Sequence, residues 1–224
     1  MRARTYQLII FDWDGTLVDS QAQIISCMQV AFERIGLEKP ETSAIRHIIG
    51  LSLEAAFYRL APQIDHSLAL QLVDAYREHS FTNSNFSTEL FAGVRTGLLN
   101  LKEQGFYLAV ATGKGRHGLD AALNGSNLAE FFDITRCADE TRSKPDPLML
   151  DEILTDLDIH VDRALMIGDT SYDIQMANNI GMDSIAVTYG MHEAHHLRPL
   201  KPRHLINHFS EIQHLIGKKT HVRS

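Results

Sequence analysis

The stretch that decides the fold is Leu8-Ile9-Ile10-Phe11-Asp12-Trp13-Asp14-Gly15-Thr16-Leu17. Its first four residues are apolar, rich in branched side chains and uncharged, which is typical of a strand buried on both faces. The run ends at two carboxylates, Asp12 and Asp14, and at a glycine that permits a turn. Taken alone, this end is equally compatible with a solvated turn. In open parallel sheets, however, chemistry gathers beyond the carboxyl ends of the strands, so we expect both acids to serve one small site.

The composition limits the classes of protein to which the chain can belong. It has 224 residues, which suit one domain or a core with a smaller insertion, and 44% of them are hydrophobic. A formal charge of -7 argues against wrapping nucleic acid or coating anionic membranes. No apolar stretch approaches the ~20 residues of a membrane helix, and the first residues lead directly into a strand. We therefore expect a cytoplasmic protein without a signal peptide, with no nucleic-acid or membrane partner.

The two cysteines do not suggest a disulfide or a metal site. Cys27 and Cys137 lie far apart in the sequence and outside any metal-ligand spacing. We expect both to be reduced thiols. The twelve histidines, His192, His195 and His196 among them, also lack a regular ligand pattern with acidic or cysteine partners, which disfavours a transition-metal site.

Residues 18–89 show the apolar spacing of helices, without a convincing strand. Apolar side chains at three- and four-residue spacing predict four helices. They fall at about residues 24–35, 45–49, 53–60 and 68–80. A crossover between two neighbouring parallel strands normally needs only ~10–12 residues. The economical explanation for so long a helical segment is an inserted cap.

Beyond Gly93 the sequence pattern changes and predicts alternating strands and helices. Strands are expected at residues 107–111, 132–135, 164–167 and 184–187, and helices at 94–104, 116–124 and from Asp146-Pro147 onward. This alternation predicts an α/β fold with a doubly wound parallel sheet. We therefore expect a core formed by residues 1–17 and 90–224, with a small helical cap domain formed by residues 18–89.

Polar, turn-forming clusters follow three of the predicted strands. Besides Asp12 and Asp14, they are Thr112-Gly113-Lys114-Gly115 and Gly168-Asp169-Thr170-Ser171-Tyr172-Asp173, and Ser143-Lys144-Pro145 lies between these two. Carboxylates without other candidate ligands suit Mg²⁺, which prefers hard oxygen donors. A hydroxyl, a lysine and backbone amides at helix starts suit a phosphate dianion. The combination predicts phosphoryl chemistry.

Four motifs in this order, Asp12-x-Asp14-Gly15-Thr16, Thr112-Gly113, Lys144-Pro145 and Gly168-Asp169 with Asp173, resemble those of the haloacid dehalogenase superfamily of hydrolases. The match is closest to the phosphoglycolate-phosphatase-like branch with a small helical cap, and it covers essentially the whole chain. Each motif is weak by itself, but four in order at the ends of the expected elements are specific. The resemblance implies a Rossmann-like core.

The resemblance also implies the catalytic roles. Asp12 would attack phosphorus and form an aspartyl-phosphate. Asp14 would protonate the leaving alcohol and then deprotonate the hydrolytic water. Thr112 would hydrogen-bond a phosphoryl oxygen, and Lys144 would balance the charge of Asp12 and the phosphate.

The same resemblance implies a Mg²⁺ cofactor. Asp169 would bind the metal together with the Asp12 carboxylate and the backbone carbonyl of Asp14. Asp173 would support this metal shell through a water molecule or by positioning Lys144. Alternatively, Asp169 and Asp173 could merely cap a helix and favour its dipole.

Three further residues are candidates for substrate binding, namely Gly113, Lys114 and Arg46. Lys114 follows the second motif directly, although it could also be only solvated. Arg46 belongs to the predicted cap, and the sequence does not decide whether it faces substrate or solvent. Asp146 is interpreted as a helix cap and Trp13 as a packing residue rather than as catalysts.

The sequence therefore predicts a Mg²⁺-dependent phosphatase of small phosphate monoesters, phosphoglycolate-like or sugar phosphates, that is a monomer or homodimer. The alternatives are a phosphomutase of the β-phosphoglucomutase kind and a non-catalytic binding protein on the same fold. Dehalogenases and phosphonate-cleaving relatives lack the second aspartate of the first motif, which this chain has as Asp14. Mutases of this branch usually have Asp-Gly-Val where this chain has Gly15-Thr16, and many have an arginine in the loop that here is Gly50-Leu51-Ser52-Leu53. These differences favour hydrolysis.

Overall fold

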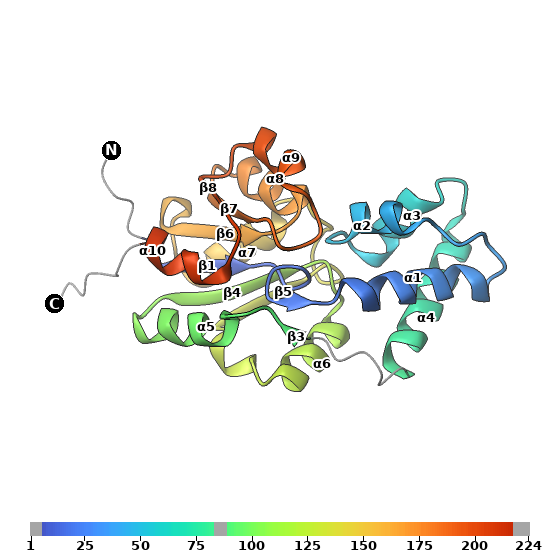
Figure 1. The fold of residues 1–224 in the computed structure, drawn as a ribbon, viewed down its shortest axis with the longest axis horizontal. Coiled ribbons are helices and arrows are strands. Elements are labelled where there is room, and N and C mark those ends of the chain that lie inside the picture. Colours follow the sequence, from blue (N-terminus) through green and yellow to red (C-terminus); the bar gives the residue numbers. More distant parts are fainter. Residues whose placement is uncertain (1–5, 83–88, 217–224) are drawn as a thin grey trace.

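A computed structural model describes residues 6–82 and 89–216 of the chain. Its strands are β1 (Leu8–Phe11), β2 (Val18–Asp19), β3 (Glu89–Leu90), β4 (Tyr107–Thr112), β5 (Ile134–Cys137), β6 (Ala164–Gly168), β7 (Asp183–Val187) and β8 (His204–Ile206). Its α-helices are α1 (Gln21–Arg34), α2 (Thr42–Ile48), α3 (Leu53–Leu60), α4 (His66–Thr82), α5 (Val94–Glu103), α6 (Arg116–Ser126), α7 (Leu148–Asp156), α8 (Ser171–Asn179), α9 (Ala194–Leu197) and α10 (Ile212–Ile216). The main sheet and the group of helices α1 to α4 lie side by side (Figure 1).

Six parallel strands form the main sheet, in the order β5-β4-β1-β6-β7-β8. β1 lies between β4 and β6, and all four of its side chains are fully buried. From β1 the chain builds outward on one side and then returns to build outward on the other, which makes β1 the point where the strand order reverses. The predicted doubly wound α/β fold is thereby confirmed, with the quoted stretch at its centre.

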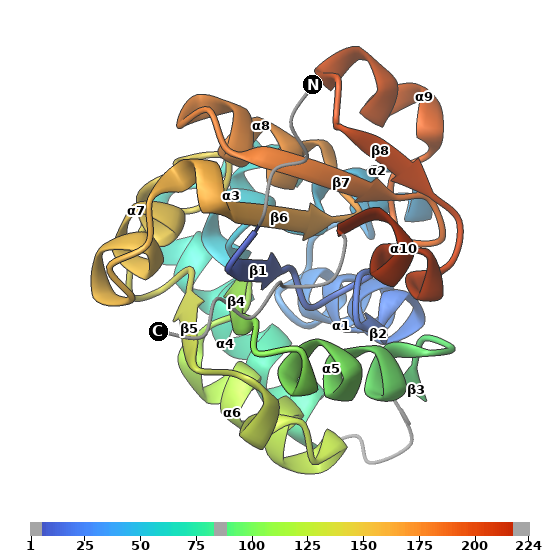
Figure 2. The same ribbon diagram turned by 90° about the vertical axis from the view of Figure 1, so that its left-hand side faces the viewer.

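Helices cover both faces of this sheet (Figure 2). Alternate side chains of β1 explain the two layers, because Ile9 and Phe11 face one layer while Leu8 and Ile10 face the other. The first layer is packed by α5, α6 and α10, and the second by α7 and α8. A strand buried on both faces needs an uninterrupted apolar sequence, which is what Leu8–Phe11 supplies.

Two edge strands differ from the sequence prediction. β5 begins at Ile134 rather than at residue 132, because a 3₁₀ turn at Ala129–Phe131 delays it. β8 was not predicted at all, since His204–Ile206 is short and lies at the opposite edge of the sheet. Edge strands bury less of their surface, so their sequences lack the long apolar runs that identified the central strands.

Helices α1 to α4 form a group with a hydrophobic cluster of their own. Phe57 is fully buried in it and contacts Phe32 and Tyr76 through their rings. The expectation that residues 18–89 contain no strand is wrong at both ends, because Val18–Asp19 pairs antiparallel with Glu89–Leu90. This two-stranded ribbon joins the segments by which the chain enters and leaves the helical group. The exact division into core and cap stays a prediction.

The helical group contacts the sheet edge through the loop between α2 and α3. A Cβ atom on Gly113 would lie only 2.5 Å from the carbonyl oxygens of Gly50 and Leu51, so glycine is required for this close approach. One residue further on, the backbone N–H of Ser52 donates to the Ser143 hydroxyl at 2.9 Å. The loop therefore touches two of the segments that carry the sequence motifs.

The structure also describes the two cysteines and the lengths of the helices. Cys27 and Cys137 are both buried and free. In the part of the chain that the structure describes, every helix is too short or too polar to cross a bilayer.

The packing of α5 provides a test of this architecture. Gly97 of α5 is buried, and an added Cβ would lie 2.4 Å from the ring of Phe209. We expect Gly97→Ala to lower the free energy of unfolding by about 1–3 kcal/mol, because the ring must move within a packed core. Gly125→Ala on the exposed side of α6 is the matched control, since its Cβ would meet nothing within 4 Å.

The control should be neutral or raise the stability by up to about 1 kcal/mol, as alanine favours helix. Urea unfolding followed by circular dichroism measures both values. Equal stabilities for the two variants would contradict the described packing.

Candidate active site

A buried lysine links two buried aspartates at the carboxyl edge of the sheet. The Lys144 ammonium donates to Asp12 Oδ1 at 2.7 Å and to Asp173 Oδ1 at 2.6 Å. Asp12 immediately follows β1, whereas Asp173 lies in the first turn of α8. All three side chains are at least 99% buried. The lysine thus connects three segments that are distant in sequence, and it contacts the two aspartates beside which the family resemblance placed it.

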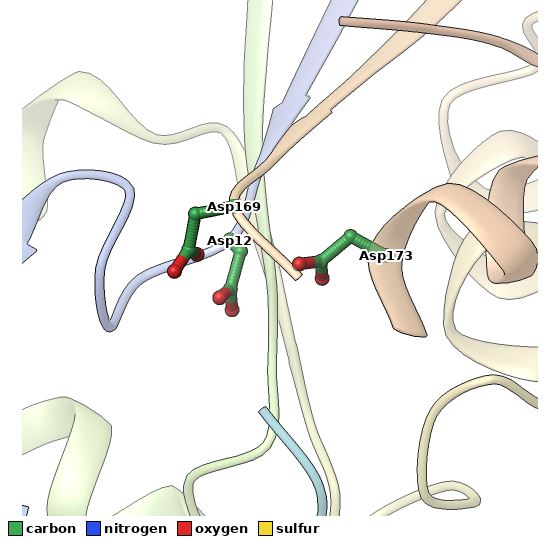
Figure 3. A group of neighbouring side chains, drawn as sticks. All are labelled: Asp12, Asp169 and Asp173. Carbon is green, nitrogen blue, oxygen red and sulfur yellow. The ribbon is translucent and has the colours of Figure 1, made fainter. Parts of the chain in front are cut away.

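Asp169 completes a group of three carboxylates that could hold a metal ion. One oxygen from each of Asp12, Asp169 and Asp173 lies within 4.8 Å of the others. Figure 3 shows the three side chains gathered from the ends of β1 and β6 and from α8. Among the described residues, no other histidine, cysteine or acidic residues form such a group. An all-oxygen donor set of this kind suits a hard divalent cation.

Direct hydrogen bonds and a tight turn hold Asp169 in place. Its Oδ1 accepts from the Thr16 hydroxyl at 2.8 Å, and its Oδ2 from the backbone N–H of Met191 at 2.7 Å. Gly15 has φ +83°, and a Cβ there would lie 2.1 Å from Asp169 Oδ2. Gly15 is therefore required both for its backbone conformation and for space. Valine in place of Thr16 would lose the hydroxyl contact with Asp169.

Asp173 has a supporting place in the cluster. Its Oδ2 accepts from the backbone N–H and the hydroxyl of Thr170, at 3.0 and 2.7 Å, as part of a capping box at the start of α8. Its Oδ1 accepts from Lys144. One carboxylate therefore caps α8 and also pairs with Lys144, while its role in a metal shell stays a prediction.

The charges in this cluster do not balance, since one ammonium faces three carboxylates. Burial, opposed by the Lys144 ammonium, raises the pKa of Asp12 to about 7. Burial likewise raises the pKa of Asp169 well above its usual range. Burial lowers the pKa of Lys144, but Asp12 and Asp173 outweigh it and leave that pKa raised, so the lysine stays charged. A divalent cation would offset the excess negative charge.

One oxygen of Asp12 is left without a partner. Asp12 Oδ2 is buried and accepts no hydrogen bond from the described residues. Buried carboxylate oxygens are normally hydrogen-bonded, so an orphaned one points to a ligand or to chemistry. Together with the uncompensated charge, it shows that the donor set fits a bound cation.

Asp14 faces a less enclosed environment. Its Oδ1 accepts from the Ser20 hydroxyl at 2.5 Å and pairs with the Lys114 ammonium at 3.0 Å. Lys114 is thus brought to the motif acids, and its backbone N–H donates to the buried Thr112 hydroxyl at 3.2 Å. The structure therefore gathers Asp14, Thr112 and Lys114 beside the buried cluster. The sequence does not predict Ser20, because a lone serine at the start of the helical segment carries no motif.

A cavity of about 440 Å³ opens between this edge of the sheet and the helical group. Asp12, Asp14, Gly113 and Lys114 line it from the sheet side, and residues of α1, α3, α4 and the α2–α3 loop line it from the other. Arg46 is not among the lining residues. Its guanidinium instead donates to Gln21 Oε1 on the exposed face, at 2.9 and 3.1 Å.

Two residues that were not expected to act as catalysts have structural places. Trp13 is 1% exposed, packs in the core and contacts the Phe132 ring, although it also lines the cavity. Asp146 precedes Pro147, which takes the N-cap position of α7 in its place, and its carboxylate accepts from the backbone N–H of Leu148 at 3.1 Å. That helix begins at Leu148 rather than at Pro147, one position later than predicted.

A histidine cluster connects the helical group to the sheet layer. The ring of His192 stacks on that of His47 of α2 with centroids 5.1 Å apart, and His196 contacts both. The backbone N–H of Ser171 donates to His192 Nδ1 at 3.0 Å, so Nε2 carries the hydrogen and donates to the His47 carbonyl at 3.2 Å. The same carbonyl accepts from Tyr172 Oη at 2.9 Å. These rings therefore pack between the helical group and the segment around α8, and His192 hydrogen-bonds to backbone groups on both sides.

The fold and the site define an α/β protein with an acidic, lysine-linked centre at the point where the strand order reverses. The sequence model of the haloacid dehalogenase-like hydrolase family matches residues 9–187, and the chain belongs to that family. The matched range begins in β1 and ends with β7, so it includes every motif residue described above.

Individual relatives are similar over nearly the full chain. "Probable phosphatase IndB" of Dickeya dadantii is 36% identical over 211 residues, which are 92% of this chain and 91% of that protein. "Pyrophosphatase PpaX" of Halalkalibacterium halodurans is 29% identical over 94% of this chain and 97% of its own length. A solved structure described as a haloacid dehalogenase-like hydrolase, from Bacteroides fragilis, superimposes with a TM-score of 0.87 at 27% identity, over 93% of this chain and 100% of that one.

The buried His192 should make stability depend on pH. Burial lowers its pKa to about 4, whereas in the unfolded chain it titrates near 6.5. Between these values the unfolded state binds more protons, so this contribution to stability is full above pH 6.5 and is lost as pH falls through 4. We expect the stability advantage of wild type over His192→Gln to shrink by roughly 3 kcal/mol from pH 7 to pH 4.

Urea unfolding at a series of pH values measures this difference. The comparison with the variant cancels the titration of carboxylates that both proteins share. Parallel stability profiles for the two proteins would show that His192 is not held neutral in the folded state.

Proposed function

We propose that this chain is a metal-dependent phosphatase that hydrolyses small phosphate monoesters through a phosphorylated Asp12. The observation that carries the proposal is the orphaned, buried Oδ2 of Asp12 beside a cavity, with a charged lysine on the other oxygen of the same carboxylate. A nucleophile needs a free lone pair facing its substrate. Relatives named as a phosphatase and a pyrophosphatase support the same class of reaction.

In the first half of the reaction, an oxygen of the Asp12 carboxylate attacks phosphorus. The new bond joins Asp12 to phosphorus, and the bond between phosphorus and the leaving oxygen breaks. Asp14 gives its proton to that oxygen, so the product leaves as a neutral alcohol. Its contacts with Ser20 and Lys114 hold the Asp14 carboxyl at the cavity wall, where a leaving group would lie.

In the second half, water attacks the phosphorus of the aspartyl-phosphate. Asp14, now a carboxylate, accepts the proton of that water, the bond from Asp12 to phosphorus breaks, and inorganic phosphate is released. Lys144 stays charged throughout and offsets negative charge next to Asp12. The Thr112 hydroxyl, beside Lys114, is proposed to donate to a phosphoryl oxygen.

We propose Mg²⁺ as the cofactor. Asp12 and Asp169 would bind it through carboxylate oxygens and Asp14 through its backbone carbonyl, while Asp173 supports the shell by fixing Lys144. When bound, the ion would supply positive charge that stabilises the phosphoryl oxygens and lets Asp12 ionise. The oxygen-only donor set favours it over softer metals.

We further propose that residues 18–89 act as a cap over the substrate. The cavity of about 440 Å³ is large enough for a small metabolite such as phosphoglycolate or a sugar phosphate. Ile48, Ile49, Gly50, Leu51 and Leu53 contribute to its wall, so the α2–α3 loop would contact the leaving group. Exclusion of water by this group would strengthen the electrostatic contacts around the phosphoryl group.

Replacing the nucleophile tests the proposed function directly. We expect Asp12→Asn to lower kcat by at least about a thousandfold, or ~4 kcal/mol of barrier, on the best small ester found by screening with Mg²⁺. Steady-state release of inorganic phosphate measures the loss. Asp146→Asn is the matched control, because that side chain accepts from the backbone N–H of Leu148 and an amide oxygen can still accept the same hydrogen bond.

The fold of Asp12→Asn should survive, since the change removes a buried charge from a cluster with excess negative charge. We expect its melting temperature in EDTA to equal or exceed that of wild type. A folded Asp12→Asn enzyme with a tenth of wild-type activity would refute the proposed nucleophile.

Removal of metal tests the acidic group as a unit. Dialysis against EDTA should abolish turnover, and Mg²⁺ should restore it. Ca²⁺ should restore it poorly, because Ca²⁺ takes more ligands at longer distances and would hold the second Asp12 oxygen away from phosphorus. Unchanged phosphate release in excess EDTA would contradict the proposed site.

A further inference from the structure

Arg77 lines the cavity from the side opposite the motif residues. It belongs to α4 of the helical group, and its side chain is exposed to the cavity opening. Within residues 6–82 and 89–216, its guanidinium has no hydrogen bond or ion pair. Arg77 differs in this respect from Lys114, the other lysine or arginine of the lining, because Lys114 forms an ion pair with Asp14.

The acidic neighbours of Arg77 are engaged elsewhere or lie apart from it. Glu78 follows it on α4 and pairs with Arg34 at 2.8 Å. Asp74, one turn earlier on the same helix, forms no ion pair with it. Asp139 also lines the cavity, and its Oδ2 lies 2.6 Å from the point that a Cβ on Gly115 would occupy, but its two oxygens accept from the backbone N–H of Arg116 at 2.9 and 3.1 Å and form no ion pair with Arg77. The positive charge of Arg77 is therefore not offset by an ion pair within the described residues.

The position of the guanidinium relates it to the motif segment. Arg77 Nη2 lies 3.6 Å from the point that a Cβ on Gly115 would occupy. Gly115 directly follows Lys114 in the loop after β4, so Arg77 stands at the far end of the loop that begins with Thr112. A ligand whose phosphoryl group is near Asp12 would extend along this loop toward Arg77.

An aromatic contact lies close to Arg77 in the sequence of α4 and in the cavity lining. Phe81, four residues later on α4, contacts the ring of His117 on α6 with centroids 4.5 Å apart. Both residues line the cavity. The contact joins the helical group to α6 of the sheet layer, so the lining around Arg77 is built from both sides of the cavity.

We propose that Arg77 recognises a second negative charge on the substrate, a carboxylate or phosphate group carried by the leaving group. This inference rests on the proposed phosphatase function and deepens it, because it names the chemical class of the ester. A guanidinium presents paired donors that match the two oxygens of a carboxylate or phosphate. The preferred substrates are then small phosphate esters or anhydrides with an anionic leaving group, rather than neutral sugar-like esters.

Matched pairs of substrates test this inference. 2-Phosphoglycolate is compared with 2-hydroxyethyl phosphate, in which a neutral hydroxymethyl group replaces the carboxylate. Pyrophosphate is compared with methyl phosphate, which distinguishes a phosphate from a carboxylate as the recognised anion. All four are assayed with Mg²⁺ in wild type, Arg77→Gln, Arg77→Lys and the control Arg59→Gln. Arg59 is an exposed arginine of α3 outside the cavity lining.

We expect wild type to prefer at least one anionic member over its neutral partner. Arg77→Gln should lower kcat/KM for that member by about tenfold or more, mainly through KM, and should change the neutral partner by less than about twofold. Arg77→Lys should fall between, since it keeps the charge but loses the paired donors. Arg59→Gln should leave both ratios unchanged.

An equal loss on charged and neutral esters would overturn the inference, because it would indicate a structural role. So would an unchanged preference in Arg77→Gln, or wild type without preference in either pair. If Arg77→Gln does not fold, the same comparison is made with Arg77→Lys, and an unchanged preference there is the overturning result.

A binding measurement separates this inference from the proposed function. Calorimetry records binding of 2-phosphoglycolate and of pyrophosphate to Asp12→Asn with and without Arg77→Gln, in the presence of Mg²⁺. If wild type hydrolyses none of the four compounds, the proposed function fails for this class. Weaker binding of either anion in the double variant by about tenfold would still support Arg77 as the recognition residue, and equal binding of both would refute it.

Discussion

The bridge from Lys144 to Asp12 and Asp173 is the interaction on which the site depends. It joins the end of the central strand, the first turn of α8 and the segment before α7 through fully or almost fully buried side chains. Breaking a buried ion pair costs about 3–5 kcal/mol, because the remaining charge is left uncompensated. The three segments are thereby held in one relative position, which the proposed role of Asp12 as a nucleophile would require.

This bridge also explains why the site is electrostatically incomplete. Lys144 offsets only part of the charge of three carboxylates, and one Asp12 oxygen stays unpaired. A well-satisfied core would instead pair every buried polar atom. The protein keeps the cluster folded in spite of this cost, since the surrounding strands are packed on both faces. Strain of this kind is typical of positions kept for binding or reaction rather than for stability.

The sequence predicted the parts of the molecule that local patterns encode. Leu8–Phe11 is an uninterrupted apolar run, so it is recognisable as a buried strand. The motif acids follow parallel strands whose carboxyl ends lie at the same edge of the sheet. Edge strand β8 has no such pattern, because pairing on one side suffices to place it. Arg46 and Arg77 show the limit most clearly. Both are arginines of the helical group, but only the tertiary packing decides that Arg77 lines the cavity while Arg46 bonds to Gln21.

The contacts between the helical group and the sheet involve the same segments that carry the motifs. The Gly50 carbonyl lies against Gly113, and Ser52 bonds to the residue before Lys144. The His47 carbonyl accepts from Tyr172, next to Asp173 in the sequence. If residues 18–89 move as a cap, then opening breaks contacts to three of the four motif segments at once. Closure of such a cap would then be coupled to assembly of the site, and a ligand that bridges Arg77 and Asp12 would favour the closed state by its contacts to both sides.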